Sequence, residues 1–295
     1  MYQTAFSFFI ATLLFITTSS HTLPYTSSLV IGIDHIPLAV RDLDQAATFY
    51  RSIGFALKPG RSHSNGIRNQ HIKFRNGTEL ELITASQPHD SVTAEYCRLL
   101  KEGEGPAFWG LFTKDTEGIA KQLTAIGQEY QREGSMITFS ETDRLHTLFF
   151  GGRNHSPTDR EEHFQHTNSA TNLIGVWIAT SDSEVYTNLF KNLSLHVTFQ
   201  TKQTPFQKKK VAVVSLPEGE IVFFPASEQV SKRLTVIGAT ISVSDMKQVQ
   251  TSLRQAGIKN VSVTQNTDDT QSLFLPPSHT HGIWLEFKQT SISNK

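Results

Sequence analysis

The chain has 295 residues, of which 27 are basic and 27 acidic, so its formal net charge is zero. This balance argues against a nucleic-acid-binding protein, which would carry a basic stripe. The hydrophobic fraction of 38% is enough for a packed core, and the single cysteine, Cys97, excludes an internal disulfide.

The first element in chain order is an apolar segment that begins at Ala5 and ends near Thr17. It is too short to span a bilayer as a helix, but it has the length of the apolar region of a signal peptide. We expect residues 1–20 to be a signal peptide and the protein to be exported, either periplasmic or secreted. An uncleaved anchor is the alternative, because no Lys or Arg precedes the apolar stretch. We expect no membrane span in the mature chain.

One sequence pattern recurs along the rest of the chain: an apolar strand, an aspartate and an amphipathic helix. It reads "IDHIPLAVRDLDQAATFYRSIGF" in the first unit, and the units start at Ile33, Pro106, Leu173 and Val236. The junction aspartates, which suit helix N-caps, are Asp42, Asp115, Asp182 and Asp245. Strand-like stretches follow the helices, so each unit is expected to be one strand, one helix and three strands.

The first unit and the junction "HFQHTNSATNLIGV" resemble the glyoxalase-like domain family of the vicinal oxygen chelate superfamily. That superfamily includes glyoxalase I, the extradiol dioxygenases and the bleomycin-resistance proteins. The resemblance implies an α+β fold of four βαβββ modules that pair into two bowl-shaped sheets. The first bowl would cover residues 30–170, and the second, degenerate bowl would cover residues 171–290.

The alternation of side chains along a strand predicts which residues of the first unit share a face. In the first strand the aliphatic set that begins at Ile36 should lie under the helix, so His35 has the opposite parity. The same argument predicts that Asn69, His71 and Glu81 face the open side of the sheet. These four side chains are therefore expected to face the first bowl.

Two acids beside this set are expected to lie outside the bowl. Asp34 is expected to face the helix side of the sheet, where it would make a structural hydrogen bond. Glu79 shares the parity of Glu81, but it lies near the start of its strand and is expected to be solvated.

The superfamily places its metal ligands on the first and fourth strands of a module, and His35 and Glu81 match those positions. A histidine with a carboxylate suits a divalent metal such as Fe, Zn, Ni or Mn. His155, in "GGRNHSP", is the candidate for a third ligand. The alternative for His35 is a structural imidazole that is satisfied by hydrogen bonds.

The later units lack a matching histidine. The positions that correspond to His35 are Phe108, Gly175 and Gly238. The fourth unit keeps an acid, Glu286, at a place that resembles Glu81. The second bowl is therefore expected to be a scaffold or an interface.

Four residues are candidates for substrate binding. Asn69 and His71 are expected to face the bowl, whereas Arg61 and Arg68 lie in a polar loop at its rim. An arginine there would suit an anionic substrate group, because its guanidinium offers a forked pair of donors. A solvated hairpin is the alternative for this loop.

The resemblance implies a metal-dependent lyase, isomerase or dioxygenase that acts on a small oxygen-rich molecule. Glu81 would then also move the proton. A non-catalytic protein that binds or sequesters a small molecule is the first alternative, because the later units lack ligands. An extradiol dioxygenase ranks third, because that family places its ligands in the later modules. A homodimer remains open, and no nucleic-acid partner is expected.

Overall fold

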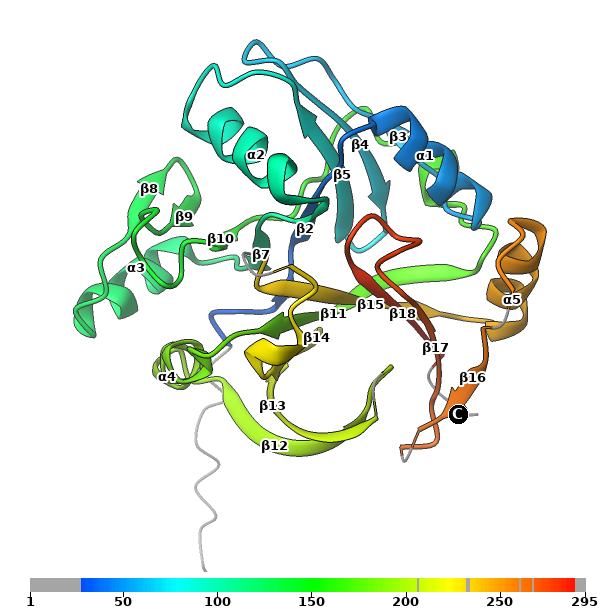
Figure 1. Ribbon diagram of the computed structural model, residues 1–295. Coiled ribbons are helices and arrows are strands. Elements are labelled where there is room, and N and C mark those ends of the chain that lie inside the picture. Colours follow the sequence, from blue (N-terminus) through cyan, green and yellow to red (C-terminus); the bar gives the residue numbers. More distant parts are fainter. Residues whose placement is uncertain (1–27, 206, 232–233, 260, 267, 290–295) are drawn as a thin grey trace, which may run out of the picture.

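The computed structural model describes residues 28–289, apart from 206, 232, 233, 260 and 267 (Figure 1). The signal peptide expected at 1–20 lies outside these residues. None of the described helices is both long and apolar enough to cross a membrane.

The elements alternate between single helices and groups of strands, as the repeated sequence pattern predicts. The N-terminal half begins with β1 (Gly32–Ile33), β2 (His35–Ala39), α1 (Leu43–Ser52), β3 (Lys58–Pro59), β4 (Ile67–Lys73) and β5 (Glu79–Ala85). It continues with α2 (Ser91–Glu102), β6 (Gly105–Pro106), β7 (Trp109–Phe112), α3 (Thr116–Ala125), β8 (Gln131–Glu133), β9 (Met136–Thr138), β10 (Leu148–Gly151) and the 3-10 helix η1 (Glu161–Phe164).

The C-terminal half follows the same order. Its first part contains β11 (Ala170–Ala179), α4 (Ser183–Asn192), β12 (His196–Gln203), β13 (Lys208–Leu216), β14 (Gly219–Phe224) and the 3-10 helix η2 (Ala226–Glu228). Its second part contains β15 (Val236–Val243), α5 (Met246–Gln255), β16 (Val263–Gln265), β17 (Gln271–Leu275) and β18 (Trp284–Gln289).

The described strands form three mixed, curled sheets, so the fold is α+β as expected (Figure 1). Two five-stranded sheets, β3-β4-β5-β2-β6 and β1-β7-β10-β9-β8, belong to the N-terminal half. The chain through β1 and β2 pairs antiparallel with the chain through β6 and β7, and this pairing joins the two sheets. The third sheet has eight described strands, in the order β12-β13-β14-β11-β15-β18-β17-β16.

Helix α1 packs on one face of the first sheet in the way that its sequence predicts. The Asp42 side chain caps the helix by accepting hydrogen bonds from two backbone N–H groups. Its buried stripe, which meets the aliphatic side chains of β2, consists of Leu43, Ala46, Ala47 and Tyr50. Asp115 and Asp245 cap α3 and α5 in the same way, whereas Asp182 makes no capping hydrogen bond within the described chain.

Helix α2 covers part of the opposite face of the same sheet. Tyr96, Leu99 and Leu100 pack against Ile83 of β5 and Ala39 of β2 in a separate small cluster. The two faces of this sheet are therefore covered by different helices, and α2 forms a wall beside the polar residues of β2 and β5.

The two halves share one continuous hydrophobic core, which contains residues from every long helix except α2. Polar contacts also cross between the halves. The Tyr50 hydroxyl donates to the Thr280 carbonyl at 3.0 Å, and Glu104 lies 2.8 Å from the His281 ring.

Gly238 of β15 occupies the position that corresponds to His35, and the structure leaves no room there for a side chain. A Cβ atom at Gly238 would lie 2.4 Å from the Trp177 ring. The Trp177 indole is fixed in this place because its N–H donates to the Thr240 hydroxyl at 3.0 Å. The indole therefore fills the space that an imidazole occupies in the N-terminal half.

We expect Gly238→Ala to lower the free energy of unfolding by about 1–3 kcal/mol, because the added methyl group would overlap the indole. Urea denaturation followed by far-UV circular dichroism measures this difference. Gly103→Ala is the control, since Gly103 has extended backbone with φ of 169° and open space around its Cβ position. Equal stability of the two variants would contradict this account of Trp177.

Candidate functional site

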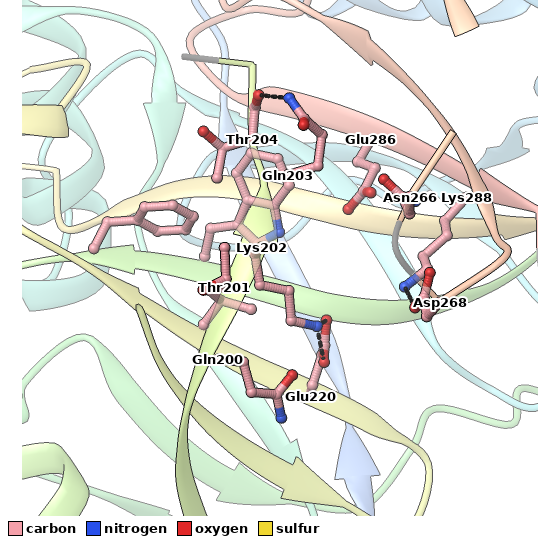
Figure 2. Close-up of a pocket in the computed structure, with 13 residues that line it drawn as sticks. Gln200, Thr201, Lys202, Gln203, Thr204, Glu220, Asn266, Asp268, Glu286 and Lys288 are labelled. Atoms are coloured by element: carbon pink, nitrogen blue, oxygen red, sulfur yellow. Dashed lines mark hydrogen bonds and ion pairs between the residues drawn. The ribbon is translucent and has the colours of Figure 1, made fainter. Parts of the chain in front are cut away.

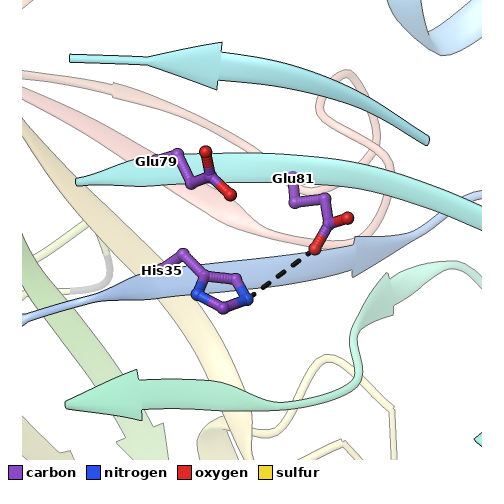
Figure 3. A group of neighbouring side chains, drawn as sticks. All are labelled: His35, Glu79 and Glu81. Atoms are coloured by element: carbon purple, nitrogen blue, oxygen red, sulfur yellow. Dashed lines mark ion pairs between the residues drawn. The ribbon is translucent and has the colours of Figure 1, made fainter. Parts of the chain in front are cut away.

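Three metal-binding side chains meet where β2 and β5 run parallel. The register sets His35 beside Glu79 and Pro37 beside Glu81, so the histidine and both glutamates share one face. One ligand atom from each of His35, Glu79 and Glu81 lies within 4.8 Å of the others, and no other such group occurs in the described chain (Figure 3). The predicted facing of His35 and Glu81 is thus present, with Glu79 added to it.

Asp34 fixes the orientation of the His35 ring. The Asp34 carboxylate lies 3.0 Å from His35 Nδ1, which carries the proton in this contact, so Nε2 faces Glu81 Oε2 at 3.7 Å. Burial lowers the pKa of His35, but the hydrogen bond with Asp34 and the charges of Asp34, Glu81 and Glu79 raise it to about 9. Asp34 makes the structural hydrogen bond that the sequence predicts, but its partner is His35 and not a group on the helix side of the sheet.

Glu81 is held at the floor of a cavity by Asn69. The Asn69 amide donates to Glu81 Oε1 at 2.6 Å, which leaves Oε2 directed toward His35. Asn69 was expected to contact substrate, but in the structure its side chain supports the carboxylate. The register also sets His71 beside Glu81 on the neighbouring strand, on the same face.

Glu79 is buried, with 3% of its surface exposed, so its expected solvation is wrong. His71 Nδ1 lies 3.4 Å from its Oε1, and Lys73 Nζ lies 3.9 Å from its Oε2. Burial alone would raise the pKa of Glu79, but His71, His35 and Lys73 lower it. Glu79 Oε2 has no hydrogen-bond partner among the described residues, so a buried acceptor beside His35 remains unsatisfied.

A buried ion-pair network lies behind Glu79. Lys73 has 1% of its side chain exposed, and its Nζ donates to Asp159 Oδ2 at 2.7 Å. Lys58 Nζ approaches the other oxygen of Asp159 at 2.5 Å. Burial alone would raise the pKa of Asp159, but hydrogen bonds from Lys58, Lys73 and the Ser156 amide lower it to about 2. This network ties the loop after β10 to β3 and β4.

A cavity of about 450 Å³ opens above His35 and Glu81. The second N-terminal sheet and its loops supply an apolar wall, made of Phe108, Phe139, Leu148 and Phe149. Phe149 packs against the His35 ring with 5.0 Å between centroids. The cavity therefore combines a polar floor with an aromatic wall.

The rim of this cavity carries exposed apolar side chains. Val92 of α2 is 48% exposed and Met136 of β9 is 37% exposed, and both line the cavity. Charged groups also lie there, among them Arg98, which forms an ion pair with Glu95.

The structure does not bring His155, Arg61 or Arg68 to this floor. The exposed imidazole of His155 lies against Gly77, because a Cβ atom at Gly77 would be 2.7 Å from its Nε2. The group of converging ligands in the described chain does not include it. Arg68 lies 3.7 Å from Asp44 of α1, on the helix side of the sheet. Neither Arg61 nor Arg68 is among the described residues that line the cavity.

The sequence reasoning missed Asp34, Glu79 and Lys73 as parts of the site. The sequence did contain an indication of their role, because charged residues are closely spaced in these short strands. Asp34 directly precedes His35, and Glu79 shares the parity of Glu81. Charges this closely spaced on one strand face need partners when they are buried.

The donor atoms at this site fit a divalent metal ion. An imidazole nitrogen and two carboxylates are ligands that first-row divalent metals accept. Asp34 accepts from Nδ1 of His35, so Nε2 is the nitrogen that binds an ion once it has lost its proton, as outer carboxylates arrange at metal centres. The unsatisfied Glu79 Oε2 is a second observation in favour of an ion.

A family model described as a glyoxalase-like domain matches residues 33–194 of the chain. The search of curated proteins found no match. The family match covers the whole candidate site and extends through α4.

The solved structures that resemble the chain share its fold at low sequence identity. Catechol 2,3-dioxygenase matches with a TM-score of 0.61 and 11% identity, over 89% of this chain and 93% of its own. A mutant of 4-hydroxymandelate synthase from Streptomyces coelicolor matches with a TM-score of 0.59 and 12% identity, over 88% and 92%. A xylose isomerase-like TIM barrel/4-hydroxyphenylpyruvate dioxygenase fusion protein matches with a TM-score of 0.65 and 10% identity, over 91% of this chain. This chain spans only 50% of the fusion protein.

We expect Asp159→Asn to lower the free energy of unfolding by about 3 kcal/mol at pH 7, because two buried lysines would lose their carboxylate. The pKa of Asp159 falls from 3.8 to about 2 on folding, so its stabilising effect is present above pH 3.8 and disappears as the pH falls through about 2. Urea titrations at pH 7, 4 and 2 should therefore show a difference between wild type and variant that shrinks with acid.

Glu161→Gln is the matched control for this change. Glu161 pairs with Arg75 on the surface, where both side chains are exposed, so its loss should have little effect on stability at any of these pH values. A similar loss in both variants would mean that the buried network has no special role.

Proposed function

The chain belongs to the glyoxalase-like domain family, and from this premise we propose that its N-terminal half is a metal-dependent enzyme for a small oxygen-rich substrate. The observation that carries the proposal is the convergence of His35, Glu79 and Glu81 below a cavity. The proposed reaction class is that of a lyase, an isomerase or a dioxygenase. In this proposal the chain consists of four βαβββ modules in two bowls, and the second bowl is degenerate.

The proposed ion is Fe, Zn, Ni or Mn, held by His35 Nε2 and by the carboxylates of Glu79 and Glu81. When bound, it would stabilise negative charge on a substrate oxygen as a Lewis acid. Asp34 keeps His35 Nδ1 protonated and so makes the ring a neutral ligand once Nε2 has lost its proton.

Glu81 is the residue that we propose to move the proton. Unlike Glu79, it lines the cavity, so its carboxylate is accessible to a bound molecule. Asn69 holds one oxygen of Glu81 and thereby fixes the other toward the cavity floor. A general base needs a carboxylate oxygen within reach of the substrate, and a residue that lines the cavity meets this requirement.

The aromatic wall narrows the substrate class. Phe108 and Phe149 face the polar floor from the second sheet and offer no hydrogen bonds. A substrate that fits would have an apolar body and oxygen atoms at one end. The same wall would exclude water from the reacting group.

A non-catalytic binding or sequestering protein is the second candidate. It is favoured by the hydrogen bonds that Asp34 and Asn69 make, which partly satisfy His35 and Glu81 without an ion. Phe108 stands where a second histidine would be needed, which also favours it. An extradiol dioxygenase is less favoured, because that family places its metal ligands in the later modules. In this chain the Trp177 indole fills the space beside Gly238 that such a ligand would need. Export and a homodimer stay predictions from the sequence.

We expect the full-length protein, purified without a histidine tag, to contain about one metal ion per chain by elemental analysis. His35→Ala, Glu79→Gln and Glu81→Gln should each reduce metal affinity roughly tenfold or more, because each removes a ligand. His155→Ala is the control and should retain the metal, since His155 lies against Gly77.

A wild-type protein that takes up none of Fe(II), Zn, Ni or Mn on reconstitution would rule out the metal-dependent reading and favour the binding protein. Metal that is lost in His155→Ala but retained in Glu79→Gln would restore the ligand set expected from the sequence.

A further inference from the structure

The C-terminal half contains a second, smaller cavity of about 110 Å³ (Figure 2). It lies against β12, β14 and β18, and its lining includes Trp177, Phe224 and Glu286. A volume of this size holds roughly four to nine waters, so a ligand would have about that many non-hydrogen atoms. The cavity belongs to the half of the chain that the proposed function leaves without a role.

Glu286 is a buried acid at this cavity that has hydrogen bonds but no counter-ion. It is 8% exposed, and the hydroxyls of Thr240 and Ser272 donate to its two oxygens at 2.7 and 2.5 Å. Within the described residues, no lysine, arginine or histidine forms an ion pair with it. A carboxylate buried in this way is normally paired with a cation.

Glu286 accepts the hydrogen bonds that its neighbours donate, and those neighbours accept hydrogen bonds in turn. The Trp177 indole N–H donates to the Thr240 hydroxyl, and the Asn266 amide donates to the Ser272 hydroxyl at 2.8 Å. An indole N–H can only donate, so this direction is fixed on the Trp177 side. Two chains of donors thus end on one carboxyl group, an arrangement that favours negative charge on it.

The other charges of the cavity compensate one another. Lys202 forms an ion pair with Glu220 at 2.5 Å, and Lys288 forms one with Asp268 at 3.2 Å. Figure 2 shows both pairs together with Glu286 around the same space. Three acids and two lysines leave a formal charge of −1 when Glu286 is ionised, so a single positive charge would neutralise the cavity.

Aromatic rings form the remaining side of the cavity. Trp177 and Phe224 both line it, and their ring centroids are 5.6 Å apart. Aromatic faces attract cations, most strongly when water is excluded. An organic cation would therefore meet a carboxylate and two aromatic rings.

A metal ion fits this cavity less well than an organic cation. The one group of three converging metal ligands in the described chain is that of His35, Glu79 and Glu81 in the other half. Here the indole of Trp177 fills the place that a ligating histidine would need above Gly238.

We propose that the C-terminal cavity binds a small primary ammonium compound, whose charged group contacts Glu286 beside Trp177 and Phe224. The amide and lysine side chains of β12 at the cavity, which include Gln200 and Lys202, would contact the polar remainder of the ligand. This proposal is independent of metal binding in the N-terminal half.

Isothermal titration calorimetry on the full-length protein tests this proposal. The probes are ethanolamine, n-butylamine and 4-amino-1-butanol, and the matched neutral compounds are ethylene glycol, butan-1-ol and 1,4-butanediol. We expect at least one amine to bind with a stoichiometry of one, and the neutral compounds to show no saturable heat. Glu286→Gln keeps the size of the side chain and one of its two acceptor oxygens but removes its charge, so it should weaken amine binding roughly tenfold or more.

Two further measurements separate a binding defect from a folding defect. Glu129→Gln makes the same chemical change at an exposed acid of the other half and should leave amine affinity unchanged. Trp177→Phe keeps an aromatic ring in place and should weaken binding less than Glu286→Gln does.

Several outcomes would overturn the proposal. These are the absence of saturable binding by every amine, equal binding of the neutral compounds, and full amine affinity in folded Glu286→Gln. Binding of Mg²⁺ or Zn²⁺ that is lost in Glu286→Gln while no amine binds would also overturn it, and would identify the cavity as a metal site instead.

Discussion

Burial of two like charges on one strand, β5, is the constraint on which the N-terminal half depends. The parallel register of β2 and β5 brings His35, Glu79 and Glu81 onto one face, where the two carboxylates repel each other unless cations compensate them. His35 supplies one positive charge, because the surrounding acids raise its pKa. Lys73 supplies another from β4, and Asp159 balances Lys73 in turn. The loop after β10 is thus part of the electrostatics of the site, although it lies behind the cavity.

The alternation of strands and the caps of helices made much of this arrangement predictable from the sequence. The period of two placed His35 and Glu81 on the open face, and the junction aspartate Asp42 caps its helix as expected. These predictions rest on local geometry, which depends on neighbouring residues alone. The family model matches residues 33–194, which include the strands of His35 and Glu81 and the helix that Asp42 caps.

The errors occurred where the outcome depends on distant parts of the chain. Glu79 lies near the start of its strand and would be solvated in an isolated sheet, but it is buried beside Lys73, which the loop after β10 holds in place. Asp34 turns to His35 because the chain leaves the strand between β1 and β2. His155 follows two glycines, whose conformational freedom removes the alternation that would have given its direction.

The two halves use the same strand geometry to present a carboxylate to different partners. Glu81 lies beside Pro37 on the parallel neighbour, and Glu286 lies beside Thr240 in the corresponding way. Two residues before that neighbour, one half has His35 and the other has Gly238 under the Trp177 indole. An imidazole in this space adds a nitrogen ligand, whereas the indole that enters it from β11 adds an aromatic face and a fixed N–H donor. In our proposals, the ring beside the carboxylate, an imidazole from β2 in one half and an indole from β11 in the other, therefore sets which kind of cation each half binds.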